Sequence, residues 1–94
     1  MMSKRRPSPD VLAAHLEGEA VLLDLATKRY FRLNATSATI WRGIEAGKSR
    51  DEIVTALLDG FDVDADTAEH AVDASIDELS RRGLLREATG DDDG

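Results

Sequence analysis

The chain has 94 residues, of which 41% are hydrophobic and only 4% are aromatic. This length supports one domain with a modest core, and it leaves no room for a separate catalytic compartment. Twelve basic and nineteen acidic residues give a net charge of -7, which disfavours nucleic acids and anionic membranes as partners because binding to phosphate is mainly electrostatic. The chain contains no cysteine, so disulfides and thiolate metal sites are excluded.

Both ends of the chain are polar. Residues 1–9 are basic and contain both prolines, and residues 88–94 include a run of aspartates. We therefore expect both ends to be flexible and the folded domain to span residues 10–87. The N-terminal residues lack the apolar run of a signal peptide, and no apolar stretch approaches the ~20 residues needed to span a bilayer. These features predict a cytoplasmic protein that does not contact membranes.

Two β-rich segments, residues 19–25 and 28–33, are separated by only two residues, which predicts an antiparallel hairpin. Residues 11–15 alternate weakly and are expected to add a first strand, although their alanines are also compatible with a helix. Side chains alternate along the second segment, with Arg29, Phe31 and Leu33 on one face and Lys28, Tyr30 and Arg32 on the other. We expect Phe31 and Leu33 to face the core.

Three helices are expected after the hairpin. Asn34, Ser49 and Asp64 are suitable N-caps, and Ser49 can form a capping box with Glu52. The apolar stripes contain Ile40, Trp41 and Ile44 in the first helix, Ile53, Val54, Leu57 and Leu58 in the second, and Ala68, Val72, Ile76 and Leu79 in the third. The third helix should end near Arg82, with Gly83 as a left-handed terminator. This order predicts an α+β fold with the helices stacked on one face of a hairpin or three-stranded sheet.

The sequence contains no pattern typical of a catalytic or metal site. His15 and His70 have no His, Asp or Glu partner at a spacing typical of zinc or catalytic sites. No serine lies in a nucleophile-elbow context, and residues 43–47 form no phosphate loop, so Gly43 and Gly47 are interpreted as helix-end residues. The acidic run at residues 62–66 lacks the glycine and the glutamate of a calcium loop. We therefore expect no enzymatic activity, no metal and no cofactor.

We expect different roles for two aromatic residues, Trp41 and Tyr30. Trp41 lies on an apolar helical stripe beside Ile40 and Ile44, so we interpret it as a core anchor whose indole N–H needs a partner. Tyr30 alternates away from the core-facing residues, and it is compatible either with cover of the sheet face or with a contact surface.

Several motifs occur together in a characteristic order. They are Val-Leu-Leu-Asp-Leu at 21–25, Arg-Tyr-Phe-Arg-Leu-Asn at 29–34, Ile-Trp at 40–41, a Gly-Lys-Ser turn at 47–49, and Gly-Leu-Leu at 83–85. This order resembles the PqqD-like family, which comprises small leader-peptide recognition domains of ribosomal peptide natural-product pathways. The resemblance implies a winged-helix-like fold with its strands placed first, and a peptide-binding module without catalytic chemistry.

The resemblance also implies where a peptide would bind. In the family, an extended leader adds to the last hairpin strand and lies in a groove between that strand and the third helix. Val72 and Ile76 are expected to form an apolar floor, and Asp73 and Asp77 to supply charge. The predicted peptide-binding residues are Lys28, Arg29, Tyr30, Phe31, Arg32, Leu33, Glu69, Val72, Asp73, Ile76 and Asp77.

The resemblance leaves the partner enzyme open. The chain is similar to the discrete recognition proteins of lasso-peptide pathways, which present the leader to a cysteine protease. It is also similar to the pyrroloquinoline quinone chaperone, which presents its peptide to a radical SAM enzyme, and overall likeness favours the lasso-peptide proteins. One alternative is a winged-helix DNA-binding regulator, which the acidic third helix opposes. Another is an interaction scaffold that holds two enzymes without binding substrate.

Overall fold

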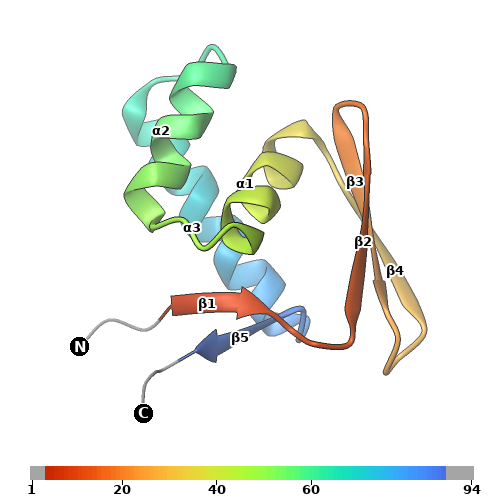
Figure 1. The fold of residues 1–94 in the computed structure, drawn as a ribbon. Helices are drawn as coiled ribbons and strands as arrows, with labels where there is room; N and C mark the ends of the chain where they lie inside the picture. Colours follow the sequence, from red (N-terminus) through yellow and green to blue (C-terminus); the bar gives the residue numbers. More distant parts are fainter. Residues whose placement is uncertain (1–3, 89–94) are drawn as a thin grey trace.

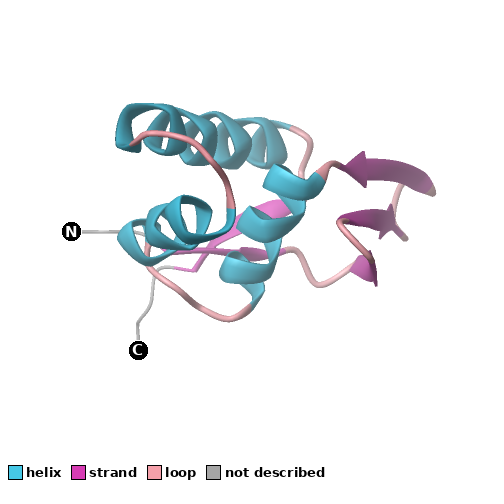
Figure 2. Ribbon diagram, turned by 90° about the horizontal axis from the view of Figure 1, so that it is seen from above, coloured by secondary structure: helices cyan, strands magenta, loops and turns pink. Residues whose placement is uncertain are grey.

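The computed structural model describes residues 4–88, which form two small sheets and three helices (Figure 1). The larger sheet is antiparallel and contains β2 (Val11–Leu16), β3 (Glu19–Asp24) and β4 (Arg29–Leu33) in that order. The helices α1 (Ala35–Glu45), α2 (Arg50–Gly60) and α3 (Ala65–Arg81) lie to one side of this sheet (Figure 2). The predicted α+β fold, with the strands placed before three helices, is confirmed.

The core lies between the inner face of the larger sheet and the helices. Alternation along β3 buries Ala20 and Leu22, and the register sets these residues opposite Leu33 and Phe31 of β4. Phe31 is partly buried and Leu33 is buried, so both face the core as predicted. Trp41 of α1 is only 1% exposed, and its Nε1–H donates a 2.8 Å hydrogen bond to Glu45 Oε2. Trp41 is therefore a core anchor whose polar atom is satisfied.

Local sequence signals account for the helix ends. The side chains of Asn34, Ser49 and Asp64 each accept a hydrogen bond from a backbone N–H three residues later, and Ser49 forms the predicted capping box with Glu52. Gly83 follows α3 with φ +76, the left-handed conformation expected of a terminator. These short-range contacts explain why the predicted helix boundaries agree with the structure to within about two residues.

Gly43 has a different role from the predicted one. It lies inside α1 rather than beyond its end, whereas Gly47 follows α1 with φ +76 as a helix-end residue. A Cβ atom at position 43 would lie 2.6 Å from Ile53 Cγ1. The missing side chain therefore allows α1 and α2 to pack closely.

The turn between β3 and β4 is longer than predicted. It comprises residues 25–28, and it is closed by a 2.7 Å hydrogen bond from Lys28 N–H to Asp24 O. Lys28 has φ +64 and belongs to the turn, not to β4. The buried Asp24 side chain accepts a 3.0 Å hydrogen bond from Ala26 N–H, which stabilises the turn in place of an Asn-Gly pair.

A second, two-stranded sheet was not expected. Residues 4–7 form β1 (Lys4–Pro7), which pairs antiparallel with β5 (Leu85–Ala88) next to the end of α3. A polar segment that ends in proline shows no strand alternation, so its pairing depends on the tertiary context rather than on local propensity. Residues 1–3 and 89–94 lie outside the described part of the chain.

Candidate functional site

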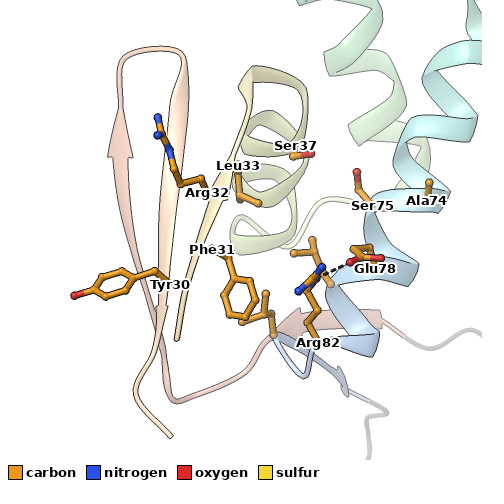
Figure 3. Close-up of a pocket in the computed structure, with 11 residues that line it drawn as sticks. Tyr30, Phe31, Arg32, Leu33, Ser37, Ala74, Ser75, Glu78 and Arg82 are labelled. Atoms are coloured by element: carbon orange, nitrogen blue, oxygen red, sulfur yellow. Dashed lines mark hydrogen bonds and ion pairs between the residues drawn. The ribbon is translucent and has the colours of Figure 1, made fainter. Parts of the chain in front are cut away.

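A groove of about 590 Å³ runs between β4 and the C-terminal half of α3 (Figure 3). One wall is the strand itself, the other is the exposed face of the helix, and the segment after α3 closes the bottom. The groove is lined by Tyr30, Phe31, Arg32, Leu33, Ser37, Ala74, Ser75, Glu78, Leu79, Arg82 and Leu84. A strand of five residues is about 17 Å long, so the groove can accommodate an extended peptide segment of similar length.

The floor of the groove is apolar and its rim is charged. Leu79 and Leu84 are buried beneath it, and Phe31 points into it from β4. The Arg82 guanidinium lies 5.4 Å from the centroid of the Phe31 ring and donates a hydrogen bond to Glu78 Oε2 (Figure 3). A cation over an aromatic face is attracted by the ring quadrupole. An apolar side chain can therefore enter between Phe31 and Leu79, beside a charged rim.

The edge of β4 that borders the groove is unpaired, since β4 pairs only with β3 among the described residues. Leu25 N–H donates a 2.8 Å hydrogen bond to Asp10 O, which continues the β2–β3 ladder. By the antiparallel alternation, Leu22 and Asp24 of β3 then direct their backbone groups to β4. The same alternation leaves the N–H and C=O groups of Tyr30 and Arg32 directed at the groove.

Four of the predicted strand residues line the groove. Tyr30, Phe31, Arg32 and Leu33 border it together, with Phe31 pointing inward and Tyr30 and Arg32 pointing away (Figure 3). The Arg32 side chain instead pairs with Glu19 of β3 at 2.7 Å. Lys28 in the turn and Arg29 at the start of β4 are exposed and do not line the groove.

The predicted residues of α3 do not line this groove. Val72 is fully buried in the core, and Ile76 packs against the core. Asp73 bonds to Arg50 of α2, and Glu69 lies 3.8 Å from the same arginine. Asp77 pairs with Arg81 one turn along the helix. The helical wall is formed instead by Ala74, Ser75, Glu78, Leu79 and Arg82.

A longer helix beside a shorter strand explains this difference. The 17 residues of α3 span about 25 Å, whereas the five residues of β4 span about 17 Å, so only part of the helix can face the strand. The structure places the C-terminal half there, and the N-terminal half packs against α2. The sequence of α3 does contain the stripe that lines the groove, because Ser75, Glu78 and Arg82 follow one another at helical intervals.

Arg50 and Asp73 dominate the electrostatics of the opposite side of α3. Arg50 Nε and Nη2 donate hydrogen bonds of 2.7 and 3.0 Å to the two carboxylate oxygens of Asp73. These bonds hold the pKa of the Asp73 carboxyl below its ordinary value and raise the pKa of the Arg50 guanidinium. Asp73 is therefore occupied in joining α2 to α3.

Both histidines form hydrogen bonds with other groups of the protein. The partly exposed side chain of His15 has its Nε2 atom 2.9 Å from Glu45 Oε1, and Arg42 Nε donates a 3.2 Å hydrogen bond to His15 Nδ1. His70 Nδ1 lies 2.9 Å from Asp66 O within α3. In residues 4–88, no three His, Cys, Asp or Glu side chains gather in a way that could hold a metal ion. The helices within the same residues are all too short or too polar to cross a membrane.

Known proteins resemble this chain in sequence and in structure. The sequence profile of the family described as coenzyme PQQ synthesis protein D (PqqD) matches residues 19–85. A solved structure described as TbiB1 in complex with the TbiA(beta) leader peptide is 35% identical, has a TM-score of 0.81, and covers 90% of this chain and 99% of its own. Another, described as lasso peptide synthetase B1 complexed with the leader peptide, is 26% identical with a TM-score of 0.80, covering 88% and 98%. No curated protein sequence matches this chain.

Proposed function

This chain belongs to the PqqD family, and we propose that it is a non-catalytic recognition protein that binds the leader of a ribosomally made precursor peptide. The observation that carries the proposal is the open edge of β4 beside the groove. An extended peptide placed there satisfies the free backbone groups of Tyr30 and Arg32 and gains a row of main-chain hydrogen bonds.

Specificity is supplied by the walls and floor of the groove. Every second side chain of an added strand points toward the floor, where Phe31 is partly exposed and Leu79 and Leu84 are buried beneath it. Arg82 and Glu78 stand at the rim, and the hydroxyls of Ser37 and Ser75 lie along the walls. The site therefore suits a leader with apolar residues two positions apart and a polar residue at the rim.

The bound leader is then presented to a processing enzyme. The similarity to two leader-bound proteins, one of them described as lasso peptide synthetase B1, favours a leader-removing protease as that enzyme. Delivery to a radical SAM enzyme, as for a pyrroloquinoline quinone precursor, is the second candidate, and the family profile supports it. Because the precursor is made on ribosomes, we place the encounter in the cytoplasm.

The acidic surface of α3 opposes the DNA-binding alternative. Glu69, Asp73, Asp77 and Glu78 are all exposed on this helix. A helix with this charge would be repelled by the phosphates that flank a major groove.

The test compares two substitutions at one position of β4. Arg32→Pro removes the backbone N–H directed at the groove and leaves the β3 ladder intact, so the protein should fold but bind leader at least 10-fold more weakly. Arg32→Ala removes only the side chain and should bind within about 3-fold of wild type, because its ion pair with Glu19 is exposed. Binding is measured by fluorescence anisotropy with a labelled synthetic leader peptide of the kind bound in the two similar solved structures.

Circular dichroism of both variants provides the folding control. Equal affinity of folded Arg32→Pro and wild type would rule out strand addition at this edge. Equal loss in both variants would mean that the guanidinium, rather than the backbone, binds the leader.

A further inference from the structure

A second, smaller cavity of about 170 Å³ lies among the three helices, where α1 and α3 begin and α2 ends. We call it the helical pocket, and it is lined by Thr36, Leu57, Phe61, Val63, Thr67, Ala68 and Ala71. Leu57 and Ala68 are buried, whereas Val63 is 37% exposed. An apolar cavity of roughly 150 Å³ can hold a benzene ring. The helical pocket therefore has room for one apolar side chain.

The helical pocket and the groove are lined by the same face of α3. Thr67 and Ala71 line the helical pocket. Ala74, Glu78 and Arg82 line the groove. These five residues follow one another at intervals of three or four, so they form one row along the helix. The two cavities therefore lie one after the other along α3.

The first turn of α1 also connects the two cavities. Ser37 lines the groove, and its neighbour Thr36 lines the helical pocket. Ser37 and Ser75 lie at the end of the groove next to Leu33 (Figure 3), and Ser75 is about one helical turn from Ala71. The end of the groove at Leu33 therefore leads toward the helical pocket.

We propose that the helical pocket is a second subsite for the leader peptide and binds one apolar side chain of the segment that extends past the end of β4. This inference rests on the proposed function. Strand addition can fix only the part of the peptide that lies beside the five residues of β4. The chain enters α1 after Leu33, so backbone pairing ends there and further affinity must come from side chains. The helical pocket provides such a contact in line with the groove.

The geometry of α3 sets the spacing of the two contacts in the peptide. Leu79 in the floor of the groove and Ala68 in the helical pocket are eleven positions apart in this helix, which corresponds to about 16 Å along its axis. An extended peptide covers about 3.3 Å per residue. The side chain in the helical pocket should therefore lie about five residues from the side chain that enters between Phe31 and Leu79.

The lining of the helical pocket selects an aliphatic residue. The residues among 4–88 that line it are all uncharged, and its polar side chains are the hydroxyls of Thr36 and Thr67. A charged leader residue would be desolvated there without a partner, whereas an aliphatic side chain gains from burial.

The test fills the helical pocket from α3. Ala71→Leu adds apolar atoms where the cavity has room for them, so the fold should be retained. Ala56→Leu is the matched control, because Ala56 is also a partly buried helical alanine but lies on the outer surface of α2 with Thr55 and Asp59. The probe is a labelled synthetic leader peptide of the kind bound in the two similar solved structures. In fluorescence anisotropy, we expect Ala71→Leu to bind about 10-fold more weakly than wild type and Ala56→Leu to bind within about 3-fold of it.

Two further measurements identify the contact. Val63→Ser removes apolar surface at an exposed position and adds no volume, so it tests the helical pocket independently of Ala71→Leu, and it should weaken binding by about 3-fold. An alanine scan of the leader is then performed with wild type and with Ala71→Leu. One aliphatic leader residue should contribute to affinity in wild type and have no further effect in Ala71→Leu, because both changes remove the same contact.

The outcomes separate this inference from the proposed function. A wild-type protein that does not bind the leader would refute the proposed function itself. Wild-type affinity in folded Ala71→Leu and in Val63→Ser would overturn the second subsite and leave the proposed function standing. An equal loss in Ala56→Leu, or a leader scan that gives the same profile with wild type and Ala71→Leu, would also overturn it.

Discussion

Arg50 is the residue that most clearly joins two helices through charge. It begins α2, and its guanidinium forms two hydrogen bonds with Asp73 in the middle of α3, at 2.7 and 3.0 Å. Asp51 and Glu69 lie 3.7 and 3.8 Å away from the same side chain. Because both partners of the main pair are half exposed, solvent screening limits the stability that the pair contributes. Its effect is best detected through pH.

The Arg50–Asp73 pair predicts an acid-sensitive contribution to stability. The Asp73 pKa is lower in the folded chain than in the unfolded chain, because Arg50 donates hydrogen bonds to the carboxylate. The contribution is therefore present above the unfolded value, near pH 4, and it is lost as the pH falls through the folded value. Arg50→Gln should reduce the free energy of unfolding at pH 7 and flatten its decrease below about pH 4.

Urea unfolding at pH 7, 4 and 3 measures this effect. Lys48→Gln is the matched control, since it removes one positive charge from a residue that has no ion pair in the described chain. A decrease with pH that is as steep in Arg50→Gln as in Lys48→Gln would show that the pair does not contribute.

At the residue scale, local interactions could be predicted and distant ones could not. Asn34, Ser49 and Asp64 were assigned as caps because each one bonds to an amide three residues away. Asp73 was expected to supply charge to the groove on the basis of the family resemblance. Its pairing with Arg50 was not expected, because the two residues are 23 positions apart and nothing in the spacing indicates that pair.

At the scale of whole elements, the contact between α1 and α2 depends on a missing side chain. Gly43 faces Ile53, which is only 2% exposed, and an added Cβ would lie 2.6 Å from its Cγ1. Ile53 is held in the core and has little room to shift. Replacing glycine by alanine within a helix usually increases stability, but here overpacking against Ile53 opposes that increase.

Two glycine substitutions test this contact. Gly43→Ala should lower the free energy of unfolding by about 1–3 kcal/mol, because the two helices must move apart. Gly60→Ala, at the end of α2 with no atom near its added Cβ, should instead be neutral or stabilise by about 0.5 kcal/mol. Urea unfolding measures both, and a stabilising effect of Gly43→Ala would show that Ile53 can repack.

The strands and helices themselves could be predicted from pattern, but their mutual placement could not. Alternation correctly assigned Phe31 and Leu33 to the inner face, and the α3 stripe correctly included Ala68, Val72 and Leu79. The groove was expected beside β4, and the structure has a groove there. The part of α3 that faces β4 depends on packing against α2, which the periodicity of a single helix does not contain.

At the scale of the whole molecule, the two ends of the described chain clamp the groove. Strand β1 pairs with β5, and the connection that follows β1 holds the segment after α3. Ser8 N–H donates a 2.9 Å hydrogen bond to Leu84 O, and the Ser8 hydroxyl donates a 2.8 Å hydrogen bond to Gly83 O. Leu84 is fully buried and lines the groove. The β1–β5 pairing joins residues about 80 positions apart, so no local pattern could indicate it.

This clamp predicts that removing β1 weakens both stability and recognition. Deletion of residues 1–7 removes four paired positions of the small sheet. At about 0.5–1.5 kcal/mol for each paired position, the free energy of unfolding should decrease by about 2–6 kcal/mol. The rest of the domain should stay folded, because the larger sheet and the helices keep their core. Hydrogen exchange should accelerate at Leu85 and Arg86, and leader affinity should decrease as Leu84 becomes less fixed.

Ser8→Ala tests the contribution of the Ser8 hydroxyl with β1 retained, because it removes only the hydrogen bond to Gly83 O. It should lower the free energy of unfolding by about 0.5–1 kcal/mol. Urea unfolding and anisotropy with the labelled leader, performed on the deletion, Ser8→Ala and wild type, measure both effects. If the deletion leaves the unfolding midpoint and the leader affinity of wild type unchanged, β1 is dispensable and the groove is held by α3 and the larger sheet alone. A decrease in stability with full leader affinity would instead show that the position of Leu84 is fixed by Leu79 and Phe31 beside it, so that the clamp supports the fold but not the recognition of the peptide.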